Sequence, residues 1–174
     1  MRSGPMYRII QGLRALTAFA RPLDESAAAQ VLNPQLLELF RRMRRSERLH
    51  SLTVMQALRS AGHADPDLLV AALLHDCGKA RWPITLPGRT LVVLVKALSP
   101  GLAARWSQGS PRGWRRPFVV AAYHAQWSAE DMAAHDAAPR AVALARRHQD
   151  EFSGPPETEE DRLLLLLMEA DGSQ

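Results

Sequence analysis

The chain of 174 residues is short of cysteine, lysine and aromatic residues, and these shortages narrow the range of functions. The single cysteine, Cys77, excludes an internal disulfide and fits a reducing compartment, so we expect a cytoplasmic protein. The apolar stretches 68–74, 91–95 and 163–168 all fall far short of the ~20 residues that a membrane span needs. Aromatic residues make up only 6% of the chain, and a nucleic acid is not expected as the main partner.

What the chain does contain is ordinary for a globular protein. Hydrophobic residues make up 47% and charged residues 23%, and the length suits one domain with its own core. The formal net charge is +4, and arginine supplies all but two of the 22 basic residues. A modest positive excess favours anionic ligands. Between Met6 and Ala20, apolar residues recur at helical spacing, which predicts an amphipathic helix packed on the domain; attachment to a membrane surface is the alternative.

Helical patterns extend over nearly the whole chain, and strand patterns are scarce. Asn33-Pro34 and Asp65-Pro66 each combine an N-cap residue with a proline at the first helical position. Only the stretch 91–95 could be helix or strand. We therefore predict an all-α domain, in which N-terminal helices within 1–44 pack on a unit formed by 45–174. The expected helices after Asn33 cover 34–45, 46–58, 66–75, 88–98, 117–124, 128–135, 139–148 and 158–170.

A histidine–aspartate pair, His75 and Asp76, directly follows the apolar stretch 68–74. Imidazole nitrogens and carboxylate oxygens are ligands for first-row divalent metals such as Mn, Fe, Co and Zn. Adjacent residues do not share a face of a straight helix, so this pair can reach one ion only where the helix ends. The Cys77-Gly78 step predicts such an ending. The further candidate ligands are His50, His124, His148 and Asp171.

Three cationic side chains lie close to these candidates in the sequence. Lys79 follows the pair by one helical turn and can balance an anionic substrate oxygen. Arg45 and Arg48 precede His50 and can reach a substrate phosphate, although a basic stretch is also typical of a solvated helix face.

Each candidate also has a structural interpretation without a metal. His75 and Asp76 could be a hydrogen-bonded pair at a helix end, and His50 could be a satisfied core histidine. Asp171 could be a polar residue near a frayed terminus. Structural or surface roles are open for the remaining histidines and the cysteine, namely His63, His124, His135, His148 and Cys77.

The order of these residues resembles the HD superfamily of metal-dependent phosphohydrolases. The segments that carry the resemblance are 48–51, 71–79 and 170–171. It implies an HD-type helical bundle, with the HD domain at 45–174, in which one ion is held by the positions matching His50, His75, Asp76 and Asp171. Members with two ions add two histidines in the interval where His124 and His148 lie. The implied cofactor is one or two ions of Mn, Fe, Co, Ni or Zn.

The resemblance implies hydrolysis of a phosphoester or phosphoanhydride bond in a small anionic substrate such as a nucleotide, with Asp76 and Lys79 as catalytic residues. Gln149 stands where cyclic-dinucleotide phosphodiesterases of the family carry a second adjacent histidine, and their Gly-Tyr-Pro signature is missing, which disfavours that substrate. Small HD proteins that cleave dinucleoside polyphosphates are closer in size. A non-catalytic HD domain that senses a metal or nucleotide is the alternative, and a scaffold without turnover is a third possibility. The oligomeric state stays open.

Overall fold

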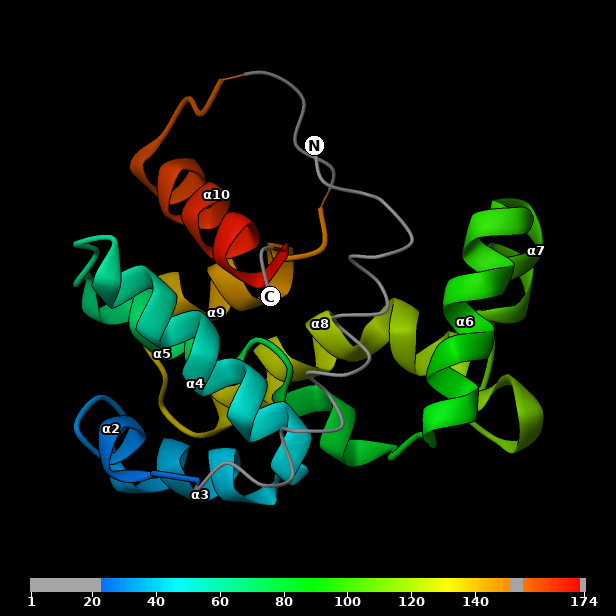
Figure 1. Ribbon diagram of the computed structural model, residues 1–174, viewed down its shortest axis with the longest axis horizontal. Helices are drawn as coiled ribbons and strands as arrows, with labels where there is room; N and C mark the ends of the chain where they lie inside the picture. Colours follow the sequence, from blue (N-terminus) through cyan, green and yellow to red (C-terminus); the bar gives the residue numbers. More distant parts are fainter. Residues whose placement is uncertain (1–22, 151–154, 173–174) are drawn as a thin grey trace.

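The computed structural model describes residues 23–150 and 155–172, and within these ranges every regular element is helical (Figure 1). The protein is therefore an all-α single domain, as predicted. The helix expected between Met6 and Ala20 lies outside the described residues. The elements are α2 (Ser26–Ala29), α3 (Pro34–Arg42), α4 (Arg45–Ser60), α5 (Pro66–Leu74), the 3₁₀ helix η2 (Cys77–Arg81), α6 (Leu86–Leu98), α7 (Pro100–Trp106), the 3₁₀ helix η3 (Gly113–Arg115), α8 (Arg116–Ala134), α9 (Pro139–Arg147) and α10 (Glu159–Gly172).

The observed elements correct two predictions and decide one that was left open. The helices expected at 117–124 and 128–135 are one continuous helix, α8, because no glycine or proline separates them and the same face stays buried through His124, Ser128 and Met132. The ambiguous stretch 91–95 is helical within α6. Helix α7 was not among the predicted helices; Pro100 occupies its first turn, where a missing N–H costs no hydrogen bond.

Helix α5 forms the centre of the main core. Its apolar residues are buried on nearly every side, as expected for a helix that other helices surround. It packs against α4, which precedes it directly, and against α9 and α10 from the C-terminal part of the chain. Burial of each leucine contributes about 1.5–3 kcal/mol to folding. This central position places the C-terminal end of α5, and the residues that follow it, deep inside the molecule.

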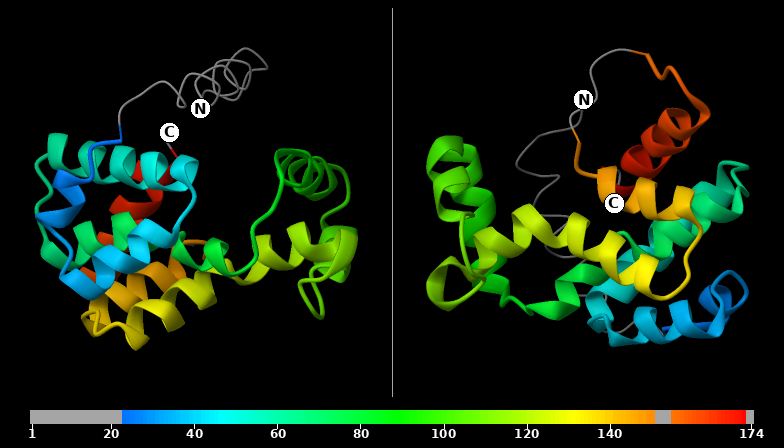
Figure 2. Two further views of the ribbon diagram at one scale, coloured as in Figure 1. Left: turned by 90° about the horizontal axis from the view of Figure 1, so that it is seen from below. Right: turned by 180° about the vertical axis from the view of Figure 1, so that it is seen from behind.

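Helices α6 and α7 stand apart from this core (Figure 2). Together with η3 and the first residues of α8 they form a projection at residues 86–118, here called the lobe. The lobe has a small core of its own around Val92, Ala103 and Phe118. Helix α8 extends from the lobe into the main body, where it packs on η2 and α9. None of the described helices is both long and apolar enough to cross a bilayer.

Candidate metal centre

The His75–Asp76 pair lies at the end of α5, where the chain leaves the helix. His75 is the C-cap residue, and Asp76 has φ −103° and ψ 1°, outside the α-helical region. The 3₁₀ helix η2 begins at Cys77. The predicted helix ending is therefore present. It lets the side chains of both residues point toward the same region, which adjacent residues on a straight helix cannot do.

Gly78 allows η2 to lie directly against α8. A Cβ atom at this position would come within 2.4 Å of the His124 carbonyl oxygen and 2.6 Å of the Ser128 nitrogen. The Gly78 amide donates a hydrogen bond to the buried Ser128 hydroxyl, at 2.8 Å. This close approach brings His124, on α8, next to Asp76.

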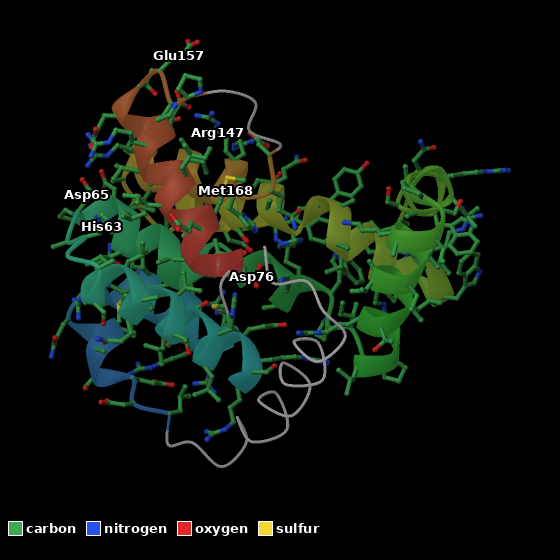
Figure 3. The ribbon with its side chains drawn as sticks, turned by 45° about the horizontal axis from the view of Figure 1, so that its top comes forward. His63, Asp65, Asp76, Arg147, Glu157 and Met168 are labelled. Atoms are coloured by element: carbon green, nitrogen blue, oxygen red, sulfur yellow. The ribbon has the colours of Figure 1, made fainter. Side chains whose placement is uncertain are left out.

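Six candidate ligands from five parts of the chain converge in one cluster that includes Asp76. Figure 3 labels Asp76 among the surrounding helices. On one side, His50 on α4 lies 2.7 Å from Asp171 on α10 through its Nε2 atom, and His75 Nε2 lies 3.6 Å from the same carboxylate oxygen. Ligand atoms of these three residues all lie within 4.8 Å of one another.

On the other side, the two oxygens of Asp76 face different histidines. Its Oδ1 atom lies 3.2 Å from Nε2 of His124 and 3.9 Å from Nε2 of His148, at the end of α9. Its Oδ2 atom lies 3.7 Å from Nε2 of His75. The set of His75, Asp76 and His148 again meets the 4.8 Å separation. His75 belongs to both sets, so the two groups form one continuous cluster.

Backbone carbonyls fix the orientation of three imidazole rings. The Nδ1 atoms of His75, His124 and His148 lie within hydrogen-bond distance of carbonyl oxygens one turn earlier in the chain, at 3.1, 2.9 and 2.7 Å. A carbonyl can only accept, so each Nδ1 carries the proton and donates it. In a neutral ring, Nε2 is then left with a lone pair directed at the cluster, the arrangement typical of a metal-binding histidine.

Two of these nitrogens also lack any hydrogen-bond partner. Nε2 of His75 and Nε2 of His124 are buried without a hydrogen bond among the described residues. A buried imidazole nitrogen left in this way is costly, and a bound cation would satisfy it. The donor set of imidazole nitrogens and carboxylate oxygens therefore fits a first-row divalent ion.

The cluster holds its carboxylates ionised. Burial would raise the pKa of Asp76, but the cationic Lys79 and His75 hold it well below its ordinary value. Burial would also raise the pKa of Asp171, but the hydrogen bond with His50 and the nearby imidazole of His75 lower it instead. His148 is different, since burial and the neighbouring His75 lower its pKa to about 3. Anionic carboxylates and a neutral imidazole are the protonation states that bind metals.

The comparison with protein families agrees with this arrangement, because the model of the HD domain matches residues 49–173. The chain belongs to the HD domain family. HD domains are typically metal-dependent phosphohydrolases. No curated protein and no solved structure gives a significant match to the chain.

The three cations predicted for the HD domain site differ in their surroundings. Lys79 Nζ forms an ion pair with Oδ2 of Asp76 at 2.6 Å. Arg48 is directed toward the carboxylate of Glu25 near α2, and half-buried Arg45 begins α4. His63 and His135 lie outside the cluster, as expected, and His135 Nδ1 bonds to the Asp131 carbonyl.

A groove of about 170 Å³ opens beside this HD domain site, between the main body and the lobe. Lys79 and His124 line it from the body side. Arg89 and Lys96 line it from α6, and Gln149 contributes from the segment after α9. The groove thus contains both lysines of the chain, and it offers positive charge next to the cluster.

Several positioning residues were not predicted from the sequence. Ser128 anchors η2 to α8, and its spacing of four residues from His124 on one helix face was a usable signal. Arg147, next to His148, binds Glu160 and Asp161 at 2.8 Å each and so ties the end of α9 to the start of α10. These pairings join distant segments, and no local pattern indicates them.

Proposed function

We propose that this HD domain is a metal-dependent phosphohydrolase that cleaves a phosphoester or phosphoanhydride bond of a small phosphorylated substrate, a nucleotide. The observation that carries the proposal is the convergence of His50, His75, Asp76 and Asp171 beside the buried Nε2 atoms of His75 and His124, which have no hydrogen-bond partner among the described residues. The positive groove beside them supports an anionic substrate. We also propose the domain division into 1–44 and 45–174; the family match begins at residue 49.

In this proposal the six residues hold one or two ions of Mn, Fe, Co, Ni or Zn. His50, His75, Asp76 and Asp171 would bind the first ion. His124 and His148 would bind a second, with Asp76 between the two because its oxygens face opposite sides of the cluster. An ion bound here would polarise a phosphoryl oxygen and lower the pKa of a bound water.

The chain's own residues would then bind the substrate and balance its charge. Lys79 would move its ammonium group from Asp76 to a phosphoryl oxygen and stabilise the negative charge that develops there. Arg89 and Lys96 would bind further phosphate oxygens along the groove. Arg45 and Arg48 are proposed as outer substrate contacts. Arg48 would have to break its ion pair with Glu25 before it could bind the substrate.

Hydrolysis assays test this proposal. The metal-loaded protein is incubated with a panel of nucleotides, dinucleoside polyphosphates and phosphodiesters, and release of phosphate or nucleotide is measured. We expect turnover of at least one substrate, and loss of that turnover in Asp76→Asn and after chelation. Tight nucleotide binding without turnover of any substrate would favour the alternative, a regulatory HD domain that senses a ligand.

A further inference from the structure

The lobe concentrates the positive charge of the protein. Residues 86–118 contain no aspartate or glutamate, and no carboxylate side chain occurs anywhere between Asp76 and Glu130. The formal charge of the chain is +4, so the lobe's six cations leave a charge of 4 − 6 = −2 for all other residues. The basic character of the molecule is thus a property of this projection. The six cations are Arg89, Lys96, Arg105, Arg112, Arg115 and Arg116.

The lobe also carries the exposed apolar surface. All large apolar side chains that are strongly exposed among the described residues lie between Leu86 and Tyr123. Leu98 is 84% exposed, Leu86 72% and Trp114 58%. Large apolar side chains that are gathered and exposed on one part of a domain indicate an interaction site.

Helix α6 has two different faces, one that lines the groove and one that is apolar and exposed. Arg89, Val92 and Lys96, at helical spacings of three and four, share the face that lines the groove. Leu91, Leu94 and Leu98, at the same spacings, share another face, and all three are exposed. The apolar face therefore points away from the candidate metal centre and from the lobe's own core.

We propose that the lobe docks on the surface of an anionic lipid bilayer. The apolar face of α6 would enter the boundary between headgroups and acyl chains, as in interfacial amphipathic helices. Trp114 would lie at the headgroup level, where tryptophan is enriched. Arg105, Arg112 and Arg115 would contact lipid phosphates, since cations near an anionic surface strengthen binding.

Charge and apolar character together favour an anionic bilayer over a second copy of the chain or a nucleic acid. A second copy seated on the same face would bring two lobes of six cations together without a single lobe carboxylate to offset them. A nucleic acid would match the charge, but among the strongly exposed large apolar side chains of the lobe only Trp114 could stack on a base, and the exposed leucines and valine offer no stacking surface. An anionic bilayer satisfies both the charge and the apolar face.

Vesicle sedimentation tests the proposal with the full-length protein. We expect the protein to sediment with vesicles of equal parts phosphatidylcholine and phosphatidylglycerol, and to stay in solution with phosphatidylcholine alone. Binding should weaken as salt is added, because salt screens exposed charges. Trp114 should shift its fluorescence to shorter wavelength with the mixed vesicles, and Trp114→Phe should remove most of that shift.

Two sets of variants separate the apolar and the charged contributions. Leu94→Ser combined with Leu98→Ser should reduce binding at least tenfold without any change of charge. Arg105→Gln combined with Arg112→Gln should reduce it by about fivefold for each arginine. The control combines Ala133→Gln and Ala138→Gln, exposed positions on the body, and should bind as the wild type.

The substituted residues lie outside the proposed metal centre and groove. The metal content and the thermal unfolding midpoint of each variant therefore show whether it is folded, independently of lipid binding. Equal binding to both kinds of vesicle, or unchanged binding in both sets of variants, would overturn the proposal. A lipid-free dimer that the serine pair abolishes would assign the face to a second copy instead. Binding to a DNA duplex that only the arginine variants lose, together with no vesicle binding, would assign it to a nucleic acid.

Discussion

At the scale of single residues, the candidate metal centre depends on imidazole orientation. Three histidines are oriented by carbonyls of their own helices, so their Nε2 atoms are presented before any ion arrives. His50 differs, because its Nε2 atom already contacts Asp171. A metal bound by the first set of ligands would therefore replace the proton between His50 and Asp171.

His148 tests whether the cluster holds one ion or two. Because His148 lies on the Oδ1 side of Asp76, His148→Ala should lower the metal content by about one ion and reduce turnover while the other site stays filled. Elemental analysis of the purified variant checks this. His135→Ala, on α8 but outside the cluster, is the matched control. If the wild type binds a single ion even in metal excess, the two-ion interpretation fails, and His124 and His148 become candidates for substrate contact or proton transfer.

The metal-free protein should lose stability as the pH falls from about 6.5 to about 4. In that window His148 takes up a proton in the unfolded chain but not in the folded one, where its pKa is about 3. His75 is protonated in both states there, because its folded pKa is raised: burial would lower it, but Asp76 and Asp171 outweigh burial. The slope is up to about 1.4 kcal/mol per pH unit.

Urea unfolding at several pH values measures this slope. The direction follows because a group with a lowered folded pKa stabilises the protein above its unfolded pKa and loses that contribution on acidification. His148→Gln removes the titrating group and should flatten the curve in this window. A wild-type curve that is flat or inverted between those pH values would contradict the protonation states assigned here.

At the scale of elements, the site depends on contact between η2 and α8. Gly78 sits where a side chain would collide with backbone atoms of α8, which cannot move aside easily. Gly78→Ala should therefore destabilise the protein by about 1–3 kcal/mol, as overpacking does. It should also weaken metal binding, because it separates His124 from Asp76. Chemical denaturation and metal titration measure both effects.

Gly101→Ala provides a control at a helical glycine with open space around it. Near-equal stability of Gly78→Ala and the wild type would mean that η2 does not need this close approach.

The sequence predicted those elements whose signals are local. Asn33 caps α3 by accepting from the Leu36 amide, and Asp65 caps α5 in the same way, as the Asn-Pro and Asp-Pro steps indicated. The helical patterns also placed His50, His124 and His148 within or at the end of predicted helices. The continuity of α8 and the existence of α7 were not predicted, since Pro100 is equally compatible with a loop and with a helix start.

The finer geometry of the site could not be predicted, because it depends on packing between distant segments. Gly78 and Ser128 are 50 residues apart, and His50 and Asp171 are 121 apart. The ion pair between Lys79 and Asp76 is local, because the two residues are three apart in the sequence. Which oxygen of Asp76 faces which histidine follows only from how α5, α8 and α9 pack together.

At the scale of the whole molecule, the groove joins the body to the lobe. Lys96 lies on the lobe yet lines the groove that leads to the metal centre. If substrate phosphate crosses this boundary, Lys96→Gln should raise KM by on the order of tenfold and leave kcat nearly unchanged, because it removes binding that the ground state and the transition state share.

Steady-state kinetics with the substrate found in the hydrolysis panel measures both constants. Arg105→Gln makes the same change of charge on the lobe outside the groove, and it should leave KM near the wild-type value. An equal rise of KM in the two variants would indicate a general effect of charge and would remove Lys96 from the substrate site.

The central claim is that one buried carboxylate, Asp76, organises a metal centre in this HD domain. Elemental analysis of the purified protein and of Asp76→Ala tests it most directly. We expect the wild type to contain or take up one or two ions of Mn, Fe, Co, Ni or Zn per chain, and Asp76→Ala to lose binding while staying folded by circular dichroism. A wild type that takes up no transition metal from excess, or an Asp76→Ala variant with unchanged stoichiometry, would contradict the claim.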